Sequence, residues 1–341
     1  MRAIRFDSFG PPTVLHPVIV PDPEAKEGEL LVQIRASAVN RLDLDERAGV
    51  SGFQIHAEHQ LGREGAGVVV AVGAGVDSHM VGRRVIVSGY RGCWHCRQCF
   101  QGRINVCENQ TRLGIDIPGT YAEFLAVPQS GIFELPESVS FEQGACLQLG
   151  LGTAWHALIR RAKLRAGETV LISGAGGGVG TAGVQVATLA GAQVIAIAST
   201  TERRELALSL GATHAIARDR DVRAKVMQLT DGRGVDVVFD GSGGSFLQTG
   251  LSVLDVGGRY VLYGSHAGNH SDVDVIAFFR SYGSLISSRG WLIEDMKAVI
   301  SEVARGSLTV AVNHLWPLDS AAQAHQEFEL GQVDGKGVLI P

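Results

Sequence analysis

Hydrophobic positions change their spacing about halfway along the chain, and this change predicts two kinds of architecture. Up to about residue 130, short apolar or alternating segments are separated by glycine, proline and acidic turns, which is typical of a β-rich domain. From about Leu151, strand-like runs alternate with helical patterns, as in a doubly wound parallel sheet. The strands expected there are 169–173, 193–198, 214–217, 235–240, 258–264 and 283–287, and the helices are 178–190, 202–211, 220–230 and 244–256.

The C-terminal tail is expected to complete the first half. It holds two helical patterns and one closing strand, at 293–305, 318–330 and 337–340, which are too few elements to bury a core alone. The sequence therefore predicts an α/β protein with a β-rich domain at 1–151, completed by 291–341, and a parallel-sheet domain at 152–290. The β-rich half is expected to contain strands at 2–6, 14–20, 30–39, 65–72, 84–87 and 121–127.

A glycine-rich turn joins the first predicted strand of the second half to its helix. A strand, a glycine turn and a helix start together form an anion site, because free backbone N–H groups and the positive helix end face a pyrophosphate. The fingerprint for dinucleotides is imperfect here, since its glycine positions fall at Ala175, Gly177 and Gly180. A turn that binds nothing is the alternative, but the strand at 193–198 supplies the context that the motif requires. The backbone expected to contact the cofactor is that of Gly174, Ala175, Gly176, Gly177, Gly178, Val179 and Gly180.

The end of the strand at 193–198 favours NADP over NAD. An acidic residue at this place would accept hydrogen bonds from the ribose 2′-hydroxyl of NAD. The chain instead has Ser199 and Thr200, which can donate to a 2′-phosphate, followed by Arg203 and Arg204, which can pair with it. A solvated helix start is the structural alternative for the two arginines, so NAD remains possible.

Composition excludes several classes of function. The 341 residues are 45% hydrophobic and 19% charged, with a net charge of −5 and dispersed acidic and basic residues, so no nucleic-acid or membrane surface is indicated. The residues after Met1 lead into a strand pattern without the apolar core of a signal peptide, and no apolar run reaches membrane-spanning length. We expect a cytoplasmic protein that acts on a small molecule.

Four of the five cysteines lie within fifteen residues, at Cys93, Cys96, Cys99 and Cys107. Four thiolates at this spacing can enclose one tetrahedral ion, and such closed sites stabilise a loop without catalysing. An iron–sulfur cluster is the alternative, but its usual run has a shorter last spacing. The sequence therefore predicts one structural zinc per chain, with His95 exposed rather than a ligand.

With these motifs in place, the whole chain resembles the medium-chain dehydrogenase/reductase superfamily of zinc alcohol dehydrogenases and quinone oxidoreductases. The resemblance implies a GroES-like N-terminal domain, a Rossmann domain, an active site in the cleft between them, and a homodimer or homotetramer joined through the Rossmann sheets. It rests on the segments 38–43 with Gly49, 61–67, the four-cysteine lobe, 152–157, the glycine turn and 335–337.

The chain departs from zinc alcohol dehydrogenases where that family binds its catalytic metal. The resemblance places the ligands at Asn40, Arg63 and Leu149, and none of these side chains is a zinc ligand of the usual kind. The hydroxyl and histidine that relay the alcohol proton are replaced by Leu42 and Asp45. A rearranged site from Cys146, His56, Glu58 and His59 is the alternative.

Without a metal, reduction of a quinone or an electron-poor C=C bond is easier than oxidation of an alcohol, because the substrate oxygen needs only hydrogen-bond stabilisation. Asn40 matches the asparagine of the quinone oxidoreductase and enoyl reductase branch. We therefore expect an NADPH-dependent reductase of that type, in which Arg63 stabilises a developing oxyanion. An ion pair of Arg63 with Glu64 or another nearby acid is the structural alternative. Asp43 and Asp45 are candidate proton donors, or helix caps.

Further residues are expected near the cofactor or the substrate. The resemblance places Thr153 against the nicotinamide, and an N-cap of a helix at 154–161 is its structural alternative. Gly241, Gly264 and Ser265 follow strands at the edge where such sheets bind ligands. Tyr121, Phe279 and Tyr282 are candidates for a substrate pocket or for the core. A zinc alcohol dehydrogenase with unusual ligands and a non-catalytic NADPH-binding sensor or structural protein are the competing functions.

Overall fold

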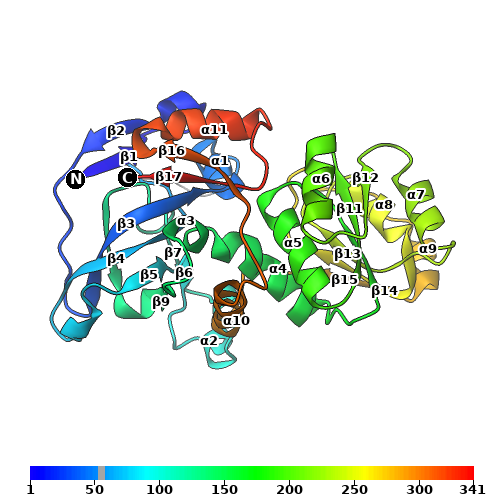
Figure 1. Ribbon diagram of the computed structural model, residues 1–341, viewed down its shortest axis with the longest axis horizontal. Helices are drawn as coiled ribbons and strands as arrows, with labels where there is room; N and C mark the ends of the chain where they lie inside the picture. The colour runs from blue at the N-terminus through cyan, green and yellow to red at the C-terminus, as the bar shows by residue number, and fades with distance from the viewer. Residues whose placement is uncertain (53–57) are drawn as a thin grey trace. The chain divides into compact units, whose positions relative to one another are not determined.

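The computed structural model describes residues 1–52 and 58–341, and these divide into two compact units (Figure 1). Unit 1 comprises Met1–Leu149 and Met296–Pro341, and unit 2 comprises Gly150–Asp295. The chain leaves unit 1 after Leu149 and returns to it at Met296, so the C-terminal tail belongs to the first unit.

Unit 2 is a parallel six-stranded sheet flanked by helices. Its strand order is β12-β11-β10-β13-β14-β15, so the chain winds outward from β10 in one direction and then from β13 in the other. Every residue of β10 is buried, as expected for a strand covered on both faces. The strands are β10 (Thr169–Ile172), β11 (Gln193–Ala198), β12 (His214–Ala217), β13 (Val235–Asp240), β14 (Leu254–Leu262) and β15 (Ser284–Ser287).

The helices of unit 2 follow the expected pattern with two differences. The expected helix at 244–256 stops early at Leu251, because Leu254 already pairs with Val235 at the start of β14. A short helix at Val275–Ser281 has no counterpart in the expectations. The helices are α4 (Thr153–Trp155), α5 (Gly178–Leu189), α6 (Thr201–Ser209), α7 (Val222–Leu229), α8 (Phe246–Leu251) and α9 (Val275–Ser281), with π-helical turns at Leu147–Gly152 and His156–Arg161.

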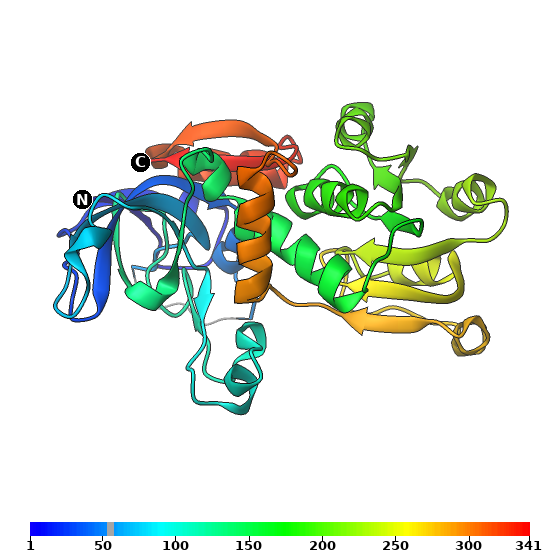
Figure 2. The same ribbon diagram turned by 60° about the horizontal axis from the view of Figure 1, so that its bottom comes forward.

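Unit 1 is organised around a sheet of seven strands, in which β16, β17, β3, β4, β5 and β9 follow one another and β8 also pairs with β3. The tail enters this sheet directly: β17 pairs antiparallel with β3, and β16, which the sequence patterns did not predict, runs parallel to β17. Figure 2 shows orange β16 beside red β17. The strands of this sheet are β3 (Glu29–Val39), β4 (Glu64–Val72), β5 (Arg84–Val87), β8 (Phe124–Pro128), β9 (Ile132–Glu134), β16 (Val312–Pro317) and β17 (Lys336–Ile340).

The core of unit 1 combines both ends of the chain. Ile4 and Phe6 from the N-terminus pack in one cluster with Trp316, Leu318 and Leu339 from the tail. This burial explains why the tail cannot be separated from the β-rich half. The remaining strands and helices are β1 (Arg2–Arg5), β2 (His16–Ile19), β6 (Tyr90–Arg91), β7 (Thr111–Arg112), α1 (Arg41–Arg47), α2 (Arg97–Phe100), α3 (Phe141–Gly144), α10 (Ile293–Ala304) and α11 (Ala321–Glu329), with 3₁₀ turns at Pro12–Val14, Ser78–Met80, Ile104–Val106, Gln129–Gly131 and Leu318–Ser320.

No helix in the described part of the chain combines the length and the apolar character needed to cross a bilayer.

Candidate functional site

The glycine turn lies between β10 and α5, next to the point where the winding of the unit 2 sheet reverses. Gly174 has a φ of +65°, which side-chain-bearing residues rarely adopt. A Cβ on Gly180 would lie only 2.1 Å from the carbonyl oxygen of Gly174, so the helix can approach the strand this closely only without a side chain there. No side chain caps α5 at Gly177, which leaves the first N–H groups of the helix available to an anion.

The carboxyl end of β11 carries hydroxyl and guanidinium groups. The side chain of Thr200 accepts a hydrogen bond from the backbone N–H of Arg203 at 3.3 Å and thereby caps α6. The side chain of Arg203 lies against the glycine turn, because a Cβ on Gly176 would be 2.6 Å from its carbon atoms. Arg204 donates to the hydroxyl of Thr201 at 2.9 Å. The 2′-phosphate candidates therefore lie beside the expected phosphate site.

Asp240 organises the same edge of the sheet at the end of β13. Its buried carboxylate accepts hydrogen bonds from the backbone N–H groups of Ser242 and Gly243 at 2.9 and 2.8 Å and from the hydroxyl of Tyr260 at 2.7 Å. These bonds fix the turn that contains Gly241. The loop after β14 contains the other two expected residues, Gly264 and Ser265, and the hydroxyl of Ser265 donates to Asn269.

Thr153 does not cap a helix, so the structural alternative for this residue, an N-cap of a helix at 154–161, is wrong. The preceding Gly152 already has helical dihedral angles, and the helical run continues from Leu147 to Arg161. Within this run, His156 shares the fully buried carboxylate of Asp295 with Arg160, at 2.7 and 2.6 Å. The sequence patterns gave no sign of this pairing, because its partners lie far apart in the chain.

In unit 1, the residues that stand in place of the family's zinc ligands lie around Glu64. The side chain of Glu64 is fully buried. One carboxylate oxygen accepts from the backbone N–H of Leu149 at 2.7 Å, and the other accepts from the ammonium of Lys336 at 2.9 Å. Lys336 also donates to the amide oxygen of Asn40 at 2.5 Å. Burial alone would lower the pKa of Lys336, but the carboxylate of Glu64 holds it above its ordinary value. Sequence reasoning assigned no role to this lysine.

Arg63 pairs with Glu46 and not with Glu64. Its Nη1 atom donates to the carboxylate of Glu46 at 2.7 Å, and both side chains are more than nine-tenths buried. Burial raises the pKa of Glu46 to about 8, against the opposing attraction of Arg63. The acid that pairs with Arg63 is therefore Glu46, which lies about one helical turn after Asp43 on α1.

Asp43 and Asn40 form a capping box at the start of α1. The carboxylate of Asp43 accepts from the backbone N–H of Asn40 at 2.9 Å, and Asp43 is fully buried. Burial raises the pKa of Asp43 to about 6, with Arg63 acting in the opposite direction. Asp45 instead pairs with Arg41 at 3.1 Å near the surface. Of the two candidate proton donors, the structure brings Asp43 to the cluster.

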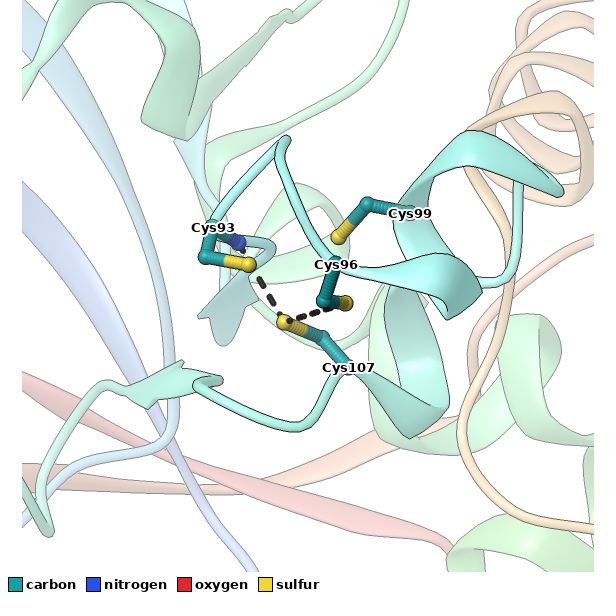
Figure 3. A group of neighbouring side chains, drawn as sticks. All are labelled: Cys93, Cys96, Cys99 and Cys107. Carbon is teal, nitrogen blue, oxygen red and sulfur yellow. Dashed lines mark hydrogen bonds between the residues drawn. The ribbon is translucent and has the colours of Figure 1, made fainter.

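Figure 3 shows the four cysteine side chains of the lobe converging on one point. Their sulfur atoms all lie within 4.8 Å of one another, as ligands of one tetrahedral ion would. The backbone N–H of Cys93 donates to the sulfur of Cys107 at 3.3 Å, a contact that favours a thiolate. The side chains therefore fit a zinc ion. The adjacent Trp94 and Phe100 are 52% and 78% exposed.

The alternative zinc ligands do not assemble among the described residues. Glu58 pairs with Arg5 at 2.8 Å, and His59 bonds to the carbonyl of Gly114. Burial raises the pKa of Cys146 to about 12, which keeps its thiol protonated. In residues 1–52 and 58–341, the four-cysteine group is the one set of three or more metal-binding side chains whose ligand atoms meet. His56 lies outside the described residues.

The three aromatic candidates differ in environment. Tyr121 is fully buried in the unit 1 core, where its hydroxyl lies 3.0 Å from His325. A core role is wrong for Phe279 and Tyr282, which are 79% and 84% exposed on and beside α9.

The parallel sheet and its glycine turn define a dinucleotide-binding protein, and comparison with known proteins gives the family. Residues 26–137 match the family model of the alcohol dehydrogenase GroES-like domain, and residues 178–305 match that of zinc-binding dehydrogenases. The quinone oxidoreductase of Rattus norvegicus is 30% identical over 96% of this chain and 93% of its own. The chain belongs to the medium-chain dehydrogenase/reductase superfamily and is an oxidoreductase, for which NAD(P) is the expected cofactor.

Other relatives bear different names. An NAD-dependent alcohol dehydrogenase of Sulfurisphaera tokodaii is 29% identical over the full length of both chains. Among solved structures, an NAD-dependent alcohol dehydrogenase superimposes with a TM-score of 0.93 at 32% identity, also over the whole of both chains. A cobalt- and zinc-bound alcohol dehydrogenase of Pyrobaculum aerophilum superimposes with a TM-score of 0.91 at 30% identity over 100% of this chain and 99% of that one. The superfamily is established, and the substrate has to be argued from the site.

Proposed function

We propose that this protein is an NADPH-dependent reductase that transfers a hydride to a quinone or to an activated C=C bond without a catalytic zinc. One observation carries the proposal, namely the composition of the buried cluster around Glu64. This cluster contains Asn40, the backbone of Leu149 and the ammonium of Lys336. Arg63 lies nearby, where its guanidinium pairs with Glu46. Arg63, a buried cation, takes the place of the imidazole ligand of the family's alcohol dehydrogenases. Asn40 takes the place of the thiolate, and the buried ammonium of Lys336 bonds to this asparagine. Ammonium and guanidinium groups repel a zinc ion and attract an oxyanion.

The residues of unit 1 act on the substrate oxygen. The bound nicotinamide supplies the hydride. Arg63 stabilises the negative charge that develops on the oxygen of an enone or quinone, and Asn40 orients the same group through its amide. Asp43 donates the proton, because burial raises the pKa of its carboxyl to about 6, which suits proton donation near neutrality.

Elemental analysis and a substrate panel test this function together. We expect one zinc per chain and NADPH oxidation with quinones, enals or enones, but no oxidation of simple alcohols. Arg63→Met is expected to lower kcat sharply with an unchanged affinity for NADPH. Two zinc ions per chain with alcohol turnover would instead establish a zinc-dependent alcohol dehydrogenase. A full rate in Arg63→Met would remove Arg63 from the mechanism.

NADP is the proposed cofactor because of the groups after β11. Ser199, Thr200 and Arg203 offer donors to a 2′-phosphate, and Ala198 occupies the strand end where an acidic residue would favour NAD. The proposed contacts to the rest of the cofactor come from the glycine turn, Thr153, Gly241, Gly264 and Ser265.

The cysteine lobe is proposed to hold one structural zinc. The ligands would be Cys93, Cys96, Cys99 and Cys107, and the ion would hold together the loop that contains α2. Because the lobe has little other regular structure, replacement of Cys99 by serine is expected to release the zinc and lower the thermal stability without changing the sheet.

Self-association is proposed to use one of the two edges of the unit 2 sheet, the one formed by β15. Strand β15 ends the sheet, and the adjoining apolar side chains of Ile276, Phe279 and Leu285 are 59%, 79% and 48% exposed. A second copy that pairs at this edge would cover these side chains and give a homodimer. Two such dimers joined through a second interface would form a homotetramer. Light scattering should show a dimer or larger species, and Phe279→Ser combined with Leu285→Lys should shift it to the monomer.

A further inference from the structure

The buried cluster of unit 1 contains one more carboxyl group than it has cations. Asp43, Glu46 and Glu64 are at most 2% exposed, and they face Arg63 and Lys336, which are 7% and 5% exposed. If all five were ionised, the cluster would carry an uncompensated negative charge away from water. Such a charge is unfavourable enough that a buried acid usually binds a proton instead.

Among the described residues, the other charged groups near the cluster do not restore the balance. Arg112 exerts an attraction on Glu46, but its guanidinium is already held by both oxygens of Asp116, at 2.8 and 2.9 Å. Arg47, fully buried on the same helix, pairs with Glu329. Each of these arginines therefore has its own carboxylate, and the excess negative charge remains in the cluster.

Hydrogen bonding shows which carboxyls can hold the proton. Both oxygens of Glu64 are satisfied, by Leu149 and Lys336, which favours its ionised form. In contrast, one oxygen of Glu46 and one of Asp43 are sealed from solvent without a partner in the described structure. Asp43 and Glu46 are three residues apart on α1, so they lie on the same face of the helix.

We propose that Glu46 is a positioning residue for Arg63: its carboxyl carries a proton, which the neighbouring charge of Asp43 helps to retain, and it anchors the guanidinium without neutralising it. This inference rests on the proposed reduction, in which Arg63 meets the substrate oxygen. A protonated Glu46 still accepts a hydrogen bond from Nη1, while the full positive charge of Arg63 remains available to the oxyanion. An ionised Glu46 would cancel much of that charge.

The proposal has a definite pH dependence. Burial raises the pKa of Glu46 to about 8 and that of Asp43 to about 6, and Arg63 opposes both shifts. Among the described residues, the groups that act on Glu46 or are acted on by it include Arg63, Asp43, Arg112 and Tyr121. The reductase rate is therefore expected to fall as pH rises through the titration of Glu46, because deprotonation weakens the field of Arg63.

Infrared spectroscopy tests the proton without any turnover. A protonated buried carboxyl has a carbonyl stretch distinct from that of a carboxylate. We expect this band in the wild type at neutral pH, its loss as pH rises through about 8, and its absence in Glu46→Gln and reduction in Asp43→Asn. A wild-type spectrum without the band would overturn the proposal even if the reductase activity is found.

Kinetics then test the positioning role. Glu46→Gln retains the acceptor oxygen and is expected to keep kcat within a few-fold while losing the fall at high pH. Glu46→Ala should lower kcat about tenfold or more with an unchanged KM for NADPH, because Arg63 loses its anchor. Glu329→Gln removes the ion pair of Arg47 at the end of α1 and should leave the pH profile intact. If Glu46→Gln and the wild type show the same dependence of kcat on pH, Glu46 does not position Arg63. If the infrared band is present but no substrate of the panel is reduced, only the proposed substrate class is refuted.

Discussion

The glycine turn of unit 2 and the charged cluster of unit 1 are built in opposite ways. The turn comes from one short segment, and its function depends on side chains that are missing, as the 2.1 Å approach at Gly180 shows. The cluster is assembled from residues nearly three hundred positions apart, with Lys336 bonded to Asn40 across 296 residues. A site made by the backbone can be read from its local sequence, while a site made by long-range ion pairs requires the fold.

Substitution of Lys336 is expected to destabilise the cluster more than any other change. Lys336→Met would leave the Glu64 carboxylate buried with a single backbone donor, because the methionine cannot donate. Removing one partner of a buried pair costs about 3–5 kcal/mol, so we expect a loss of this size in the free energy of unfolding. Chemical denaturation measures it.

A double variant sharpens this result. Glu64→Gln with Lys336→Met removes both charges, so its loss should be clearly smaller than the sum of the two single losses. Additive losses, or a loss below about 1 kcal/mol for Lys336→Met, would mean that the ion pair does not hold the cluster together.

The glycine turn offers a matched pair of substitutions. A Cβ at Gly177 would lie 3.6 Å from the nearest atom, in ordinary contact, whereas at Gly180 it would collide with backbone. Gly177→Ala should therefore fold normally but lose about 1.5–3 kcal/mol of NADPH binding, roughly ten- to a hundredfold, because the methyl group keeps the phosphate from the N–H groups. Gly180→Ala should also lose about 1–3 kcal/mol of folding stability.

Thermal denaturation and a fluorescence titration with NADPH separate these effects. Normal NADPH affinity in Gly177→Ala would show that the phosphate does not lie on this turn, and equal stability of the two variants would contradict the close approach at Gly180.

Most of the fold could be predicted from the sequence. The strands of unit 2 were located within a few residues, because strands such as β11, which is buried at every residue after Gln193, give uninterrupted apolar runs. Strand β16 was missed, since its exposed and partly buried positions give a weak pattern. The helix expected at 244–256 was too long, because the residues around Leu254 fit both helical and strand spacing, and only the pairing with Val235 decides between them.

The site was only partly predictable. Asn40, Asp43 and Arg63 were recognised as candidates, but their partners were not. Glu46 carries no motif, and the role of Lys336 depends on β17 reaching β3, which no local pattern reveals. Asp295 was missed for the same reason. Buried ion pairs follow tertiary contacts, so their partners become visible only when the strands are placed.

The stability of the cluster should depend on pH in a direction set by Glu46. Its pKa is about 8 in the folded protein and near the ordinary 4.5 when unfolded. The folded state therefore binds the proton more tightly, so this contribution to stability is complete below the unfolded value and is lost as pH rises through about 8. Between these values the loss for one proton is about 1.4 kcal/mol per pH unit at most.

Denaturation of Glu46→Gln at a series of pH values checks this contribution. The amide cannot titrate, so the variant should show a flatter dependence than the wild type, while Glu329→Gln should keep the wild-type slope. Parallel curves for Glu46→Gln and the wild type would show that Glu46 is ionised in both the folded and the unfolded state.

The smallest expected effect concerns the cofactor preference at the end of β11. Arg203 is partly exposed, so its attraction for a 2′-phosphate is screened by water, and Arg203→Ala should weaken NADPH binding by about 1 kcal/mol while leaving NADH binding unchanged. Ser199→Asp should act further, because an added carboxylate repels the phosphate and can accept from the ribose hydroxyl of NADH. The ratio of kcat/KM for the two cofactors measures both. An equal loss for NADH and NADPH in Arg203→Ala would show that its contact with the glycine turn, rather than a phosphate, explains its position.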